Sequence, residues 1–365
     1  MTKGTNKVEV YFNNELLGRL ALTPEGLCAF EYDAAFLKNG FSVSPFYLPL
    51  RSGVFIAKRD PFHGLFGVFN DSLPDGWGTL LTDRVLMKNK IPLSEVSVLD
   101  RLCLVGADGI GALSYKPKWK IVEENDDYDL NKLAREVDLI MQNDFSGHIE
   151  DLFNKGGSSG GARPKVLVKI DSKDWLVKYK SSSDPLNIGE IEYQYSLTAK
   201  KCGIDMPETR LFEGKYFATQ RFDIEGNQRY HLHSASGLLY ASYRYPSLDY
   251  TELMKATTAL THSIEEALKL FRVMVFNVLN KNRDDHAKNF SFIYKDGSWK
   301  LSPAYDLVLS VGFNGQHTTT INGNGNPSTE DLFEVAKNTG LPLKKAKLIY
   351  EEVFENSKEL KKYID

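Results

Sequence analysis

The stretch NRDDHAKNFSF, residues 282–292, places two aspartates, a histidine and an asparagine between two elements that look buried. Residues 264–279, just before it, carry apolar side chains at helical spacing and on most faces, which predicts a buried helix. Residues 290–294, at its end, alternate between aromatic and polar or smaller side chains, as in a strand. So much polar side chain between two buried elements indicates a loop that carries chemistry.

The dipeptide Asp296-Gly297 follows this stretch, and it is the strongest short-range signal for a two-residue β-hairpin. With this dipeptide at the turn, two pairs of apolar side chains share one face: Tyr294 with Trp299, and Phe292 with Leu301. The same register places Asn289 opposite Ala304 and therefore near Asp306. The hairpin thus brings two potential ligand oxygens together at its open end.

Amide and carboxylate oxygens are what a hard divalent cation prefers, with nucleotide phosphates completing its shell. Asn289 and Asp306 supply two such oxygens, and Asp284, five residues before Asn289, can accept a hydroxyl proton. A base in a loop, an asparagine on a metal and an aspartate beyond a hairpin are typical of phosphoryl-transfer enzymes. The alternative is that Asp284 and Asp285 cap turns and Asn289 begins a strand.

A second candidate region reads GGSSGGARPK, residues 156–165, with four glycines in its first six positions. It is not a Walker A loop, because Ala162 follows Gly161 and a β-hairpin follows the loop. A glycine loop that leads into a hairpin is typical of the way protein kinases cover ATP, whereas a flexible linker is the alternative. Lys178 is the candidate for the ATP phosphates, with Lys165 and Lys169 as rivals, and residues 220–223 are a candidate adenine hinge.

The composition sets broad limits on the protein class. The chain has 365 residues, of which 42% are hydrophobic and 25% are charged, and these values are typical of a globular protein of two or three domains. Its net charge of −3 gives no global sign of nucleic-acid binding. Cys28, Cys103 and Cys202 lack close spacing, which argues against a disulfide framework or a zinc site. No signal peptide or membrane span is expected, so a cytoplasmic location is predicted. His231 and His233 lack a third ligand, and a surface strand is expected there.

The order of elements predicts an α+β protein in which a β-rich half precedes a mostly helical half. Residues 8–12 and 16–22 form an expected hairpin, and helices are expected at residues 71–87, 94–105, 130–142, 190–202 and 264–279. Strands are expected at residues 166–170, 175–179 and 216–223. We expect an N-terminal α/β domain over residues 1–120, a linker and helix over 121–149, an ATP-binding lobe over 150–223 and a helical catalytic lobe over 224–365.

Five blocks of the sequence stand out together: GLFGVFNDSLPDGWG (64–78), SSGGARPK (158–165), TQRFD (219–223), DDHAKNFSF (284–292) and PAYDL (303–307). Together they resemble a known family, the HipA-type toxin kinases of bacterial type II toxin–antitoxin systems. They span nearly the whole chain in the family's order. The resemblance implies a two-lobed, protein-kinase-like fold with an N-terminal α/β domain and a mostly helical C-terminal lobe.

By this resemblance the protein is an ATP- and Mg²⁺-dependent serine/threonine protein kinase. Asp284 would be the catalytic base with His286 beside it, and Asn289 and Asp306 would hold magnesium. The other nucleotide contacts would be Ser159, Gly160, Gly161, Ala162, Arg163, Lys165, Lys178, Gln220, Arg221, Phe222 and His286. Ser158 or Ser159 would be autophosphorylated, which ejects the loop and inactivates the kinase. Asp285 stands where the family has a small or basic residue, so it stays an alternative for the base.

The resemblance also implies partners. They are a small HipB-like helix-turn-helix antitoxin, operator DNA through that antitoxin, and a protein substrate such as an aminoacyl-tRNA synthetase. No membrane partner is expected. Two other functions are open: a phosphotransferase for a lipid or small molecule, since some lipid kinases share an Asp-x-His-x-x-Asn loop, and a non-catalytic module that binds the antitoxin and DNA.

Overall fold

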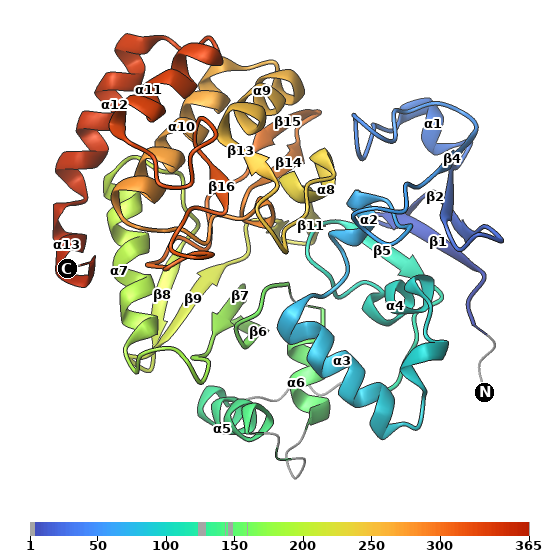
Figure 1. Ribbon diagram of the computed structural model, residues 1–365. Coiled ribbons are helices and arrows are strands. Elements are labelled where there is room, and N and C mark those ends of the chain that lie inside the picture. Colours follow the sequence, from blue (N-terminus) through green and yellow to red (C-terminus); the bar gives the residue numbers. More distant parts are fainter. Residues whose placement is uncertain (1–3, 123–128, 143, 145–148, 159, 365) are drawn as a thin grey trace. The chain divides into compact units, whose positions relative to one another are not determined.

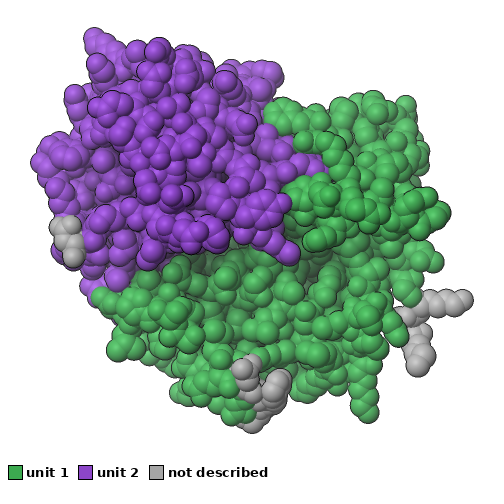
Figure 2. Space-filling model, viewed as in Figure 1, with its two compact units in different colours: residues 1–189, 215–231 green, residues 190–214, 232–365 purple. Residues whose placement is uncertain are grey.

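The computed structural model describes the chain except residues 1–3, 123–128, 143, 145–148, 159 and 365 (Figure 1). The chain divides into two compact units, coloured separately in Figure 2. Unit 1 holds residues 1–189 and 215–231, and unit 2 holds residues 190–214 and 232–365. Both units combine helices with small sheets, so the predicted α+β class is confirmed.

Unit 1 begins with a five-stranded antiparallel sheet in the order β4-β3-β2-β1-β5. Its strands are β1 (Lys7–Phe12), β2 (Glu15–Leu22), β3 (Cys28–Tyr32), β4 (Val54–Ile56) and β5 (Leu113–Lys116). The predicted first hairpin is confirmed, and its turn residues Asn13 and Asn14 have φ angles of 44° and 73°. Asparagine tolerates these angles better than most residues, as a two-residue hairpin turn requires.

Among its described residues, seven helical segments complete the first part of unit 1. They are α1 (Phe36–Asn39), α2 (Gly67–Asn70), α3 (Gly76–Lys88), η1 (Leu93–Glu95), α4 (Val98–Val105), α5 (Leu130–Met141) and α6 (Ile149–Gly156). The helix expected from residue 71 begins only at Gly76, since Pro74 disfavours helical geometry in the residue before it. The helix expected over 94–105 is divided into η1 and α4, because Ser97 forms a capping box with Asp100 and so begins a new helix, α4.

The second sheet region of unit 1 contains the hairpin that follows the glycine-rich loop. Strands β6 (Lys165–Ile170), β7 (Lys173–Lys178) and β9 (Tyr216–Gln220) pair antiparallel with β7 in the middle, and β10 (Ile224–Glu225) pairs with β11 (Gln228–Arg229). The strand expected over 216–223 ends at Gln220, because the chain turns there and Arg221 bonds the buried carboxylate of Asp223. The expected glycine loop is also one residue shorter, since Gly156 ends α6.

Unit 2 is mostly helical. Its elements are α7 (Ile188–Lys201, whose first two residues belong to unit 1), β8 (Thr209–Phe212), β12 (His231–Ser234, whose first residue belongs to unit 1), α8 (Ala235–Leu239), β13 (Leu248–Asp249), α9 (Tyr250–Thr261), α10 (Ile264–Leu279), η2 (Ala287–Asn289), β14 (Ser291–Lys295), β15 (Ser298–Leu301), β16 (Thr319–Thr320), α11 (Thr329–Asn338), α12 (Leu343–Asn356), η3 (Lys358–Leu360) and α13 (Lys361–Ile364). Strands β12, β14 and β15 form one sheet, and β13 pairs in parallel with β16.

The buried helix predicted over residues 264–279 is confirmed as α10, which Ser263 caps at its N-terminus. Ten of its residues are buried, from several faces, so it forms the centre of the unit 2 core. The predicted register of the hairpin is also confirmed, with Tyr294 paired to Trp299 and Phe292 to Leu301. No helix of the described residues is both long and apolar enough to cross a bilayer.

The expectation of a surface strand at His231 and His233 is wrong in one respect. The strand is present as β12, but both histidines have an exposed fraction of 0%. The His231 ring bonds the main-chain oxygen of Val43 through Nε2 at 2.8 Å. Alternation placed both side chains on one face correctly, but it did not show that this face is covered.

Candidate active site

The loop at residues 282–289 leaves α10 through a buried chain of amide hydrogen bonds. Asn282 Nδ2 donates to Asn277 Oδ1 at 2.9 Å, and Asn277 Nδ2 donates to the Tyr250 hydroxyl at 3.0 Å. All three side chains are at most 2% exposed. Part of the polarity around this loop therefore fixes its position, because buried polar groups need partners to be tolerated.

The two adjacent aspartates have opposite environments. Asp285 is 1% exposed, and its carboxylate accepts hydrogen bonds from Tyr250, His317, Thr318 and Thr319 at 2.9–3.2 Å. Burial, and next the carboxylate of Asp285, raise the pKa of the Tyr250 hydroxyl well above its usual value. Asp284 is exposed. Asp285 therefore holds the loop against residues 317–319, while Asp284 is the exposed aspartate of the pair.

His286 caps the short helix η2, and its Nδ1 accepts the main-chain N–H of Lys288 at 3.3 Å. In the neutral ring the proton then lies on Nε2, which can donate to a ligand. The Tyr243 ring lies 6.4 Å from the His286 ring, and Lys288 Nζ lies 4.2 Å from the centre of the Tyr243 ring. Sequence reasoning missed Tyr243, which has no motif of its own and reaches the loop only through folding.

The predicted metal ligands Asn289 and Asp306 lie close together, since both line one small cavity of about 20 Å³ in unit 2. Asn289 Nδ2 donates to the main-chain oxygen of Asp284 at 2.7 Å, which leaves its Oδ1 as the atom able to bind a cation. Asp306 is half-buried and has a φ of 55°, an uncommon conformation for a residue with a side chain. Asn282 Nδ2 also bonds the main-chain oxygen of Asp306 at 3.4 Å.

This donor set suits one kind of metal site. Among the described residues no three histidine, cysteine or acidic side chains converge as they would in a site made by protein alone. Mg²⁺ bound to a nucleotide needs only one or two protein oxygens, because phosphates and waters complete its octahedral shell. One carboxylate and one amide oxygen therefore fit a nucleotide-borne magnesium ion.

In unit 1, two of the three candidate lysines lie next to each other and beside the glycine-rich loop. Lys165 and Lys178 are paired across β6 and β7 and are 5% and 9% exposed. Lys165 Nζ donates to the main-chain oxygen of Gly160 at 2.7 Å, and Lys178 Nζ lies 5.5 Å from the centre of the Phe217 ring. Lys169 is paired with Asp174 near the other end of the hairpin. The hairpin therefore groups Lys178 and Lys165 and separates Lys169 from them.

Other predicted contacts of the loop are partly engaged within unit 1. The Arg163 guanidinium bonds both oxygens of Asp184 at 3.1–3.2 Å. Burial raises the pKa of Asp184, but Arg163 and the amide and hydroxyl of Ser181 more than offset this and lower it. The Ser158 hydroxyl donates to the main-chain oxygen of Asp108 at 2.8 Å. Ser159 lies outside the described residues.

The predicted hinge follows β9. Gln220 still pairs with Trp175, and the Arg221 amide donates to the main-chain oxygen of Asp174 at 2.8 Å. The Arg221 guanidinium bonds the carboxylate of Asp223 at 2.5–3.0 Å. Burial raises the pKa of Asp223, but Arg221 and the Gly111 amide more than offset it and hold that pKa below its usual value. Arg221 is thus engaged inside unit 1, and the hinge over Gln220, Arg221 and Phe222 stays a prediction.

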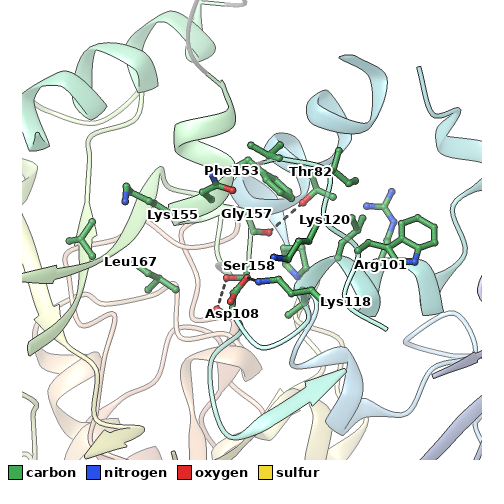
Figure 3. A pocket seen from close by; sticks show the side chains of 18 of the residues that line it. Thr82, Arg101, Asp108, Lys118, Lys120, Phe153, Lys155, Gly157, Ser158 and Leu167 are labelled. Atoms are coloured by element: carbon green, nitrogen blue, oxygen red, sulfur yellow. Dashed lines mark hydrogen bonds and ion pairs between the residues drawn. The ribbon is translucent and has the colours of Figure 1, made fainter. Parts of the chain in front are cut away.

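A larger cavity of about 650 Å³ lies in unit 1 beside the first residues of the glycine-rich loop (Figure 3). Its wall comes from α3, α4, residues 118–122, the end of α6 and the β6–β7 hairpin. Six basic side chains line it: Arg101, Lys118, Lys120, Lys155, Lys169 and Arg221. Sequence reasoning missed this cavity because these positions are spread over more than 100 residues of the chain.

Comparisons with known proteins show the family and the fold of the chain. The family model described as HipA N-terminal domain matches residues 8–116, and the model described as HipA-like C-terminal domain matches residues 157–360. Two relatives from Sinorhizobium fredii are named "Putative kinase Y4dM" and "Putative kinase Y4mE". They are 24% and 27% identical, over 86% and 84% of this chain and 80% and 78% of their own lengths. The fold is similar to a chain of the solved Shewanella oneidensis HipA, HipB and operator DNA complex, with a TM-score of 0.72, 19% identity and coverage of 98% of this chain and 90% of that one.

Proposed function

The chain belongs to the HipA family of toxins, and from that premise we propose that it is a kinase that transfers the γ-phosphoryl group of Mg²⁺-bound ATP to a serine or threonine of a protein. The observation that carries the proposal is the loop of unit 2. There Asn289 and the half-buried Asp306 line one small cavity, and the exposed Asp284 accepts a hydrogen bond from the Asn289 side chain through its main-chain oxygen. This is the donor set that phosphoryl transfer needs.

The residues of unit 2 would have distinct roles in this reaction. Asp284 would accept the proton of the attacking hydroxyl, and Nε2–H of His286 would donate to a phosphate oxygen. Asn289 Oδ1 and the Asp306 carboxylate would hold Mg²⁺, which neutralises phosphate charge when bound. Because Asp285 is occupied by four internal donors, it is not proposed as the base.

The residues of unit 1 would bind the nucleotide. Lys178 would contact its phosphates, and Lys165 would hold the loop through the Gly160 carbonyl. Backbone amides of the glycine loop are groups that approach phosphate oxygens closely. We assign these contacts to Ser159, Gly160, Ala162 and Arg163, with Gly161 as the loop residue whose amide is held by Asp75. We assign the adenine contacts to Gln220, Arg221 and Phe222.

The partners proposed for the chain follow from the family. The similar Shewanella structure is a complex of HipA, HipB and operator DNA, which supports a HipB-like antitoxin as the partner and DNA contact through it. An aminoacyl-tRNA synthetase is the proposed substrate class. We also propose autophosphorylation of Ser158 or Ser159, which would place about −1.5 to −2 charges beside the ATP phosphates and repel them.

Incubation of the purified chain with Mg²⁺-ATP, followed by phosphosite mass spectrometry, tests the proposal. Phosphate on Ser158 or Ser159 in the wild type, and none in Asp284→Asn, supports a protein kinase. ATP binding in calorimetry without any phosphoserine would instead support a phosphotransferase for a lipid or small molecule. Absence of ATP binding would refute both enzymes and leave the non-catalytic module.

A further inference from the structure

The glycine-rich loop is held by a segment of the N-terminal domain about 85 residues earlier in the chain, at the start of α3. The Gly161 amide donates to the Asp75 carboxylate, and the Trp77 amide donates to the Gly161 carbonyl at 3.0 Å. The Trp77 indole N–H donates to the main-chain oxygen of Lys165 at 3.1 Å. Both main-chain groups of Gly161 are therefore bonded to this segment.

Asp75 uses its side chain in an unusual way. It is the N-cap residue of α3, where an aspartate ordinarily accepts an amide of its own helix. Its side chain makes no such capping bond, and its carboxylate bonds the glycine loop instead. Asp75 thus connects the start of α3 to the glycine-rich loop, and a role in its own helix alone would not explain this bond.

Gly76 allows the close approach that these bonds need. It has a φ of 34°, and a Cβ added to it would lie 2.6 Å from the Cα of Ala162. Main chain therefore packs directly on main chain here, which only glycine permits. Six residues further along α3, the Thr82 hydroxyl bonds the Gly78 carbonyl of its own helix at 2.8 Å and also lies 3.4 Å from the Gly157 carbonyl. The helix α3 therefore also contacts the start of the loop (Figure 3).

We propose that Asp75 is a positioning residue of the kinase reaction, which holds the glycine-rich loop ready to receive ATP. This inference rests on the proposed function. A loop this rich in glycine has much conformational freedom to lose on binding a nucleotide. A hydrogen bond to a carboxylate is among the stronger ones, so it can remove that freedom before ATP arrives. The N-terminal domain thereby becomes part of the nucleotide-binding machinery.

The test compares Asp75→Ala and Asp75→Asn with the wild-type chain, using calorimetry with Mg²⁺-ATP and hydrogen exchange without nucleotide. Asp75→Ala should raise the Kd and the KM for ATP at least ten-fold, with kcat at saturating ATP changed less than three-fold. It should also speed amide exchange in the peptide that covers residues 157–165. Asp75→Asn keeps an accepting oxygen and should recover most of both effects.

Asp83→Ala is the matched control, since Asp83 lies on the same helix and bonds Arg101 at 2.8 Å without a bond to the loop. It should leave both ATP affinity and loop exchange unchanged. An unchanged Kd in Asp75→Ala would overturn the inference, and a lowered Kd would show that Asp75 competes with phosphate for the Gly161 amide. If the wild type binds no ATP, both the proposed kinase function and the role of Asp75 in nucleotide binding fail. If amide hydrogen exchange of residues 157–165 is the same in Asp75→Ala as in the wild type, Asp75 does not hold the loop.

Discussion

Asp284 and Asp285 are adjacent and chemically identical, yet removing each one should damage a different property. Asp284→Ala should abolish phosphotransfer and leave the free energy of unfolding unchanged, because its side chain is exposed. Asp285→Ala should destabilise the fold strongly, because its carboxylate is buried and accepts four hydrogen bonds. The pair therefore separates catalysis from structure at one point of the chain.

The size of the second effect follows from the partners that Asp285 would leave behind. Two are main-chain amides, one is the Tyr250 hydroxyl and one is Nδ1 of His317. A buried donor without an acceptor costs about 1–3 kcal/mol. If relaxation rescues half of these donors, two remain unsatisfied and the loss is roughly 2–6 kcal/mol. This range includes the roughly 3–5 kcal/mol that removing one partner of a buried charged pair usually costs. That is a large share of the roughly 5–15 kcal/mol by which proteins are stable.

Urea denaturation followed by far-UV circular dichroism measures the stability, and Mg²⁺-ATP-dependent phosphate incorporation measures the activity. Asp285→Asn should fall between the wild type and the alanine variant. It keeps an oxygen for the amides of Thr318 and Thr319 but turns an NH₂ group toward Tyr250 and His317. Asp284→Asn, its matched control, should keep the wild-type urea midpoint and lose about 10²–10⁴-fold in rate, as expected for a general base.

Two results would refute this reasoning. An Asp285→Ala chain within about 0.5 kcal/mol of the wild type would show that the buried network adds little, since changes of that size are typical of surface positions. An Asp284→Ala chain with wild-type phosphate incorporation would show that the exposed aspartate is not the base.

Three further predictions concern other parts of the chain. Asp306→Asn should abolish autophosphorylation and keep the wild-type urea midpoint, and normal phosphate incorporation would exclude Asp306 as a metal ligand. Gly76→Ala should lower the free energy of unfolding by roughly 2–5 kcal/mol, because its added Cβ would be strained and would clash with Ala162. Gly297→Ala is the comparison, since nothing lies within 4 Å of its added Cβ, and it should cost only about 1–2 kcal/mol. Urea denaturation measures both values. The pKa of Asp223 is lowered in the folded state, so its ionised carboxylate should stabilise the fold fully above about pH 4 and progressively less as the pH falls below that. Asp223→Asn should therefore be less stable than the wild type at pH 7. In urea titrations its free energy of unfolding should also fall less steeply between pH 5 and pH 2.

Local patterns predicted the elements around the active-site loop well. Apolar spacing located α10, and the Asp296-Gly297 turn fixed the register of β14 and β15. Both signals are carried by residues close together in the chain. Predictions were weaker at element ends, as at residues 71–75, where Pro74 and the capping geometry of Asp75 delay the helix.

The candidate site was only partly predictable for the same reason. The spacing within residues 284–289, together with the hairpin, was enough to group Asn289 with Asp306. The partners of Asp285 lie at residues 250 and 317–319, and no short pattern connects them to the loop. The buried state of His231 and His233 was missed because alternation shows which side chains share a face and not whether another segment covers it.

The sequence by itself determined the family, the α+β class and the kinds of chemical group available, because these depend on residue types and on spacing within single elements. Only the tertiary structure decided which of two adjacent aspartates is exposed and that Asp75 bonds a loop about 85 residues away. The physical reason is that burial and hydrogen bonding depend on which distant segments meet. At residues 282–289, local sequence supplied the reactive groups, and distant segments decided which of them reach solvent and which hold the loop in place.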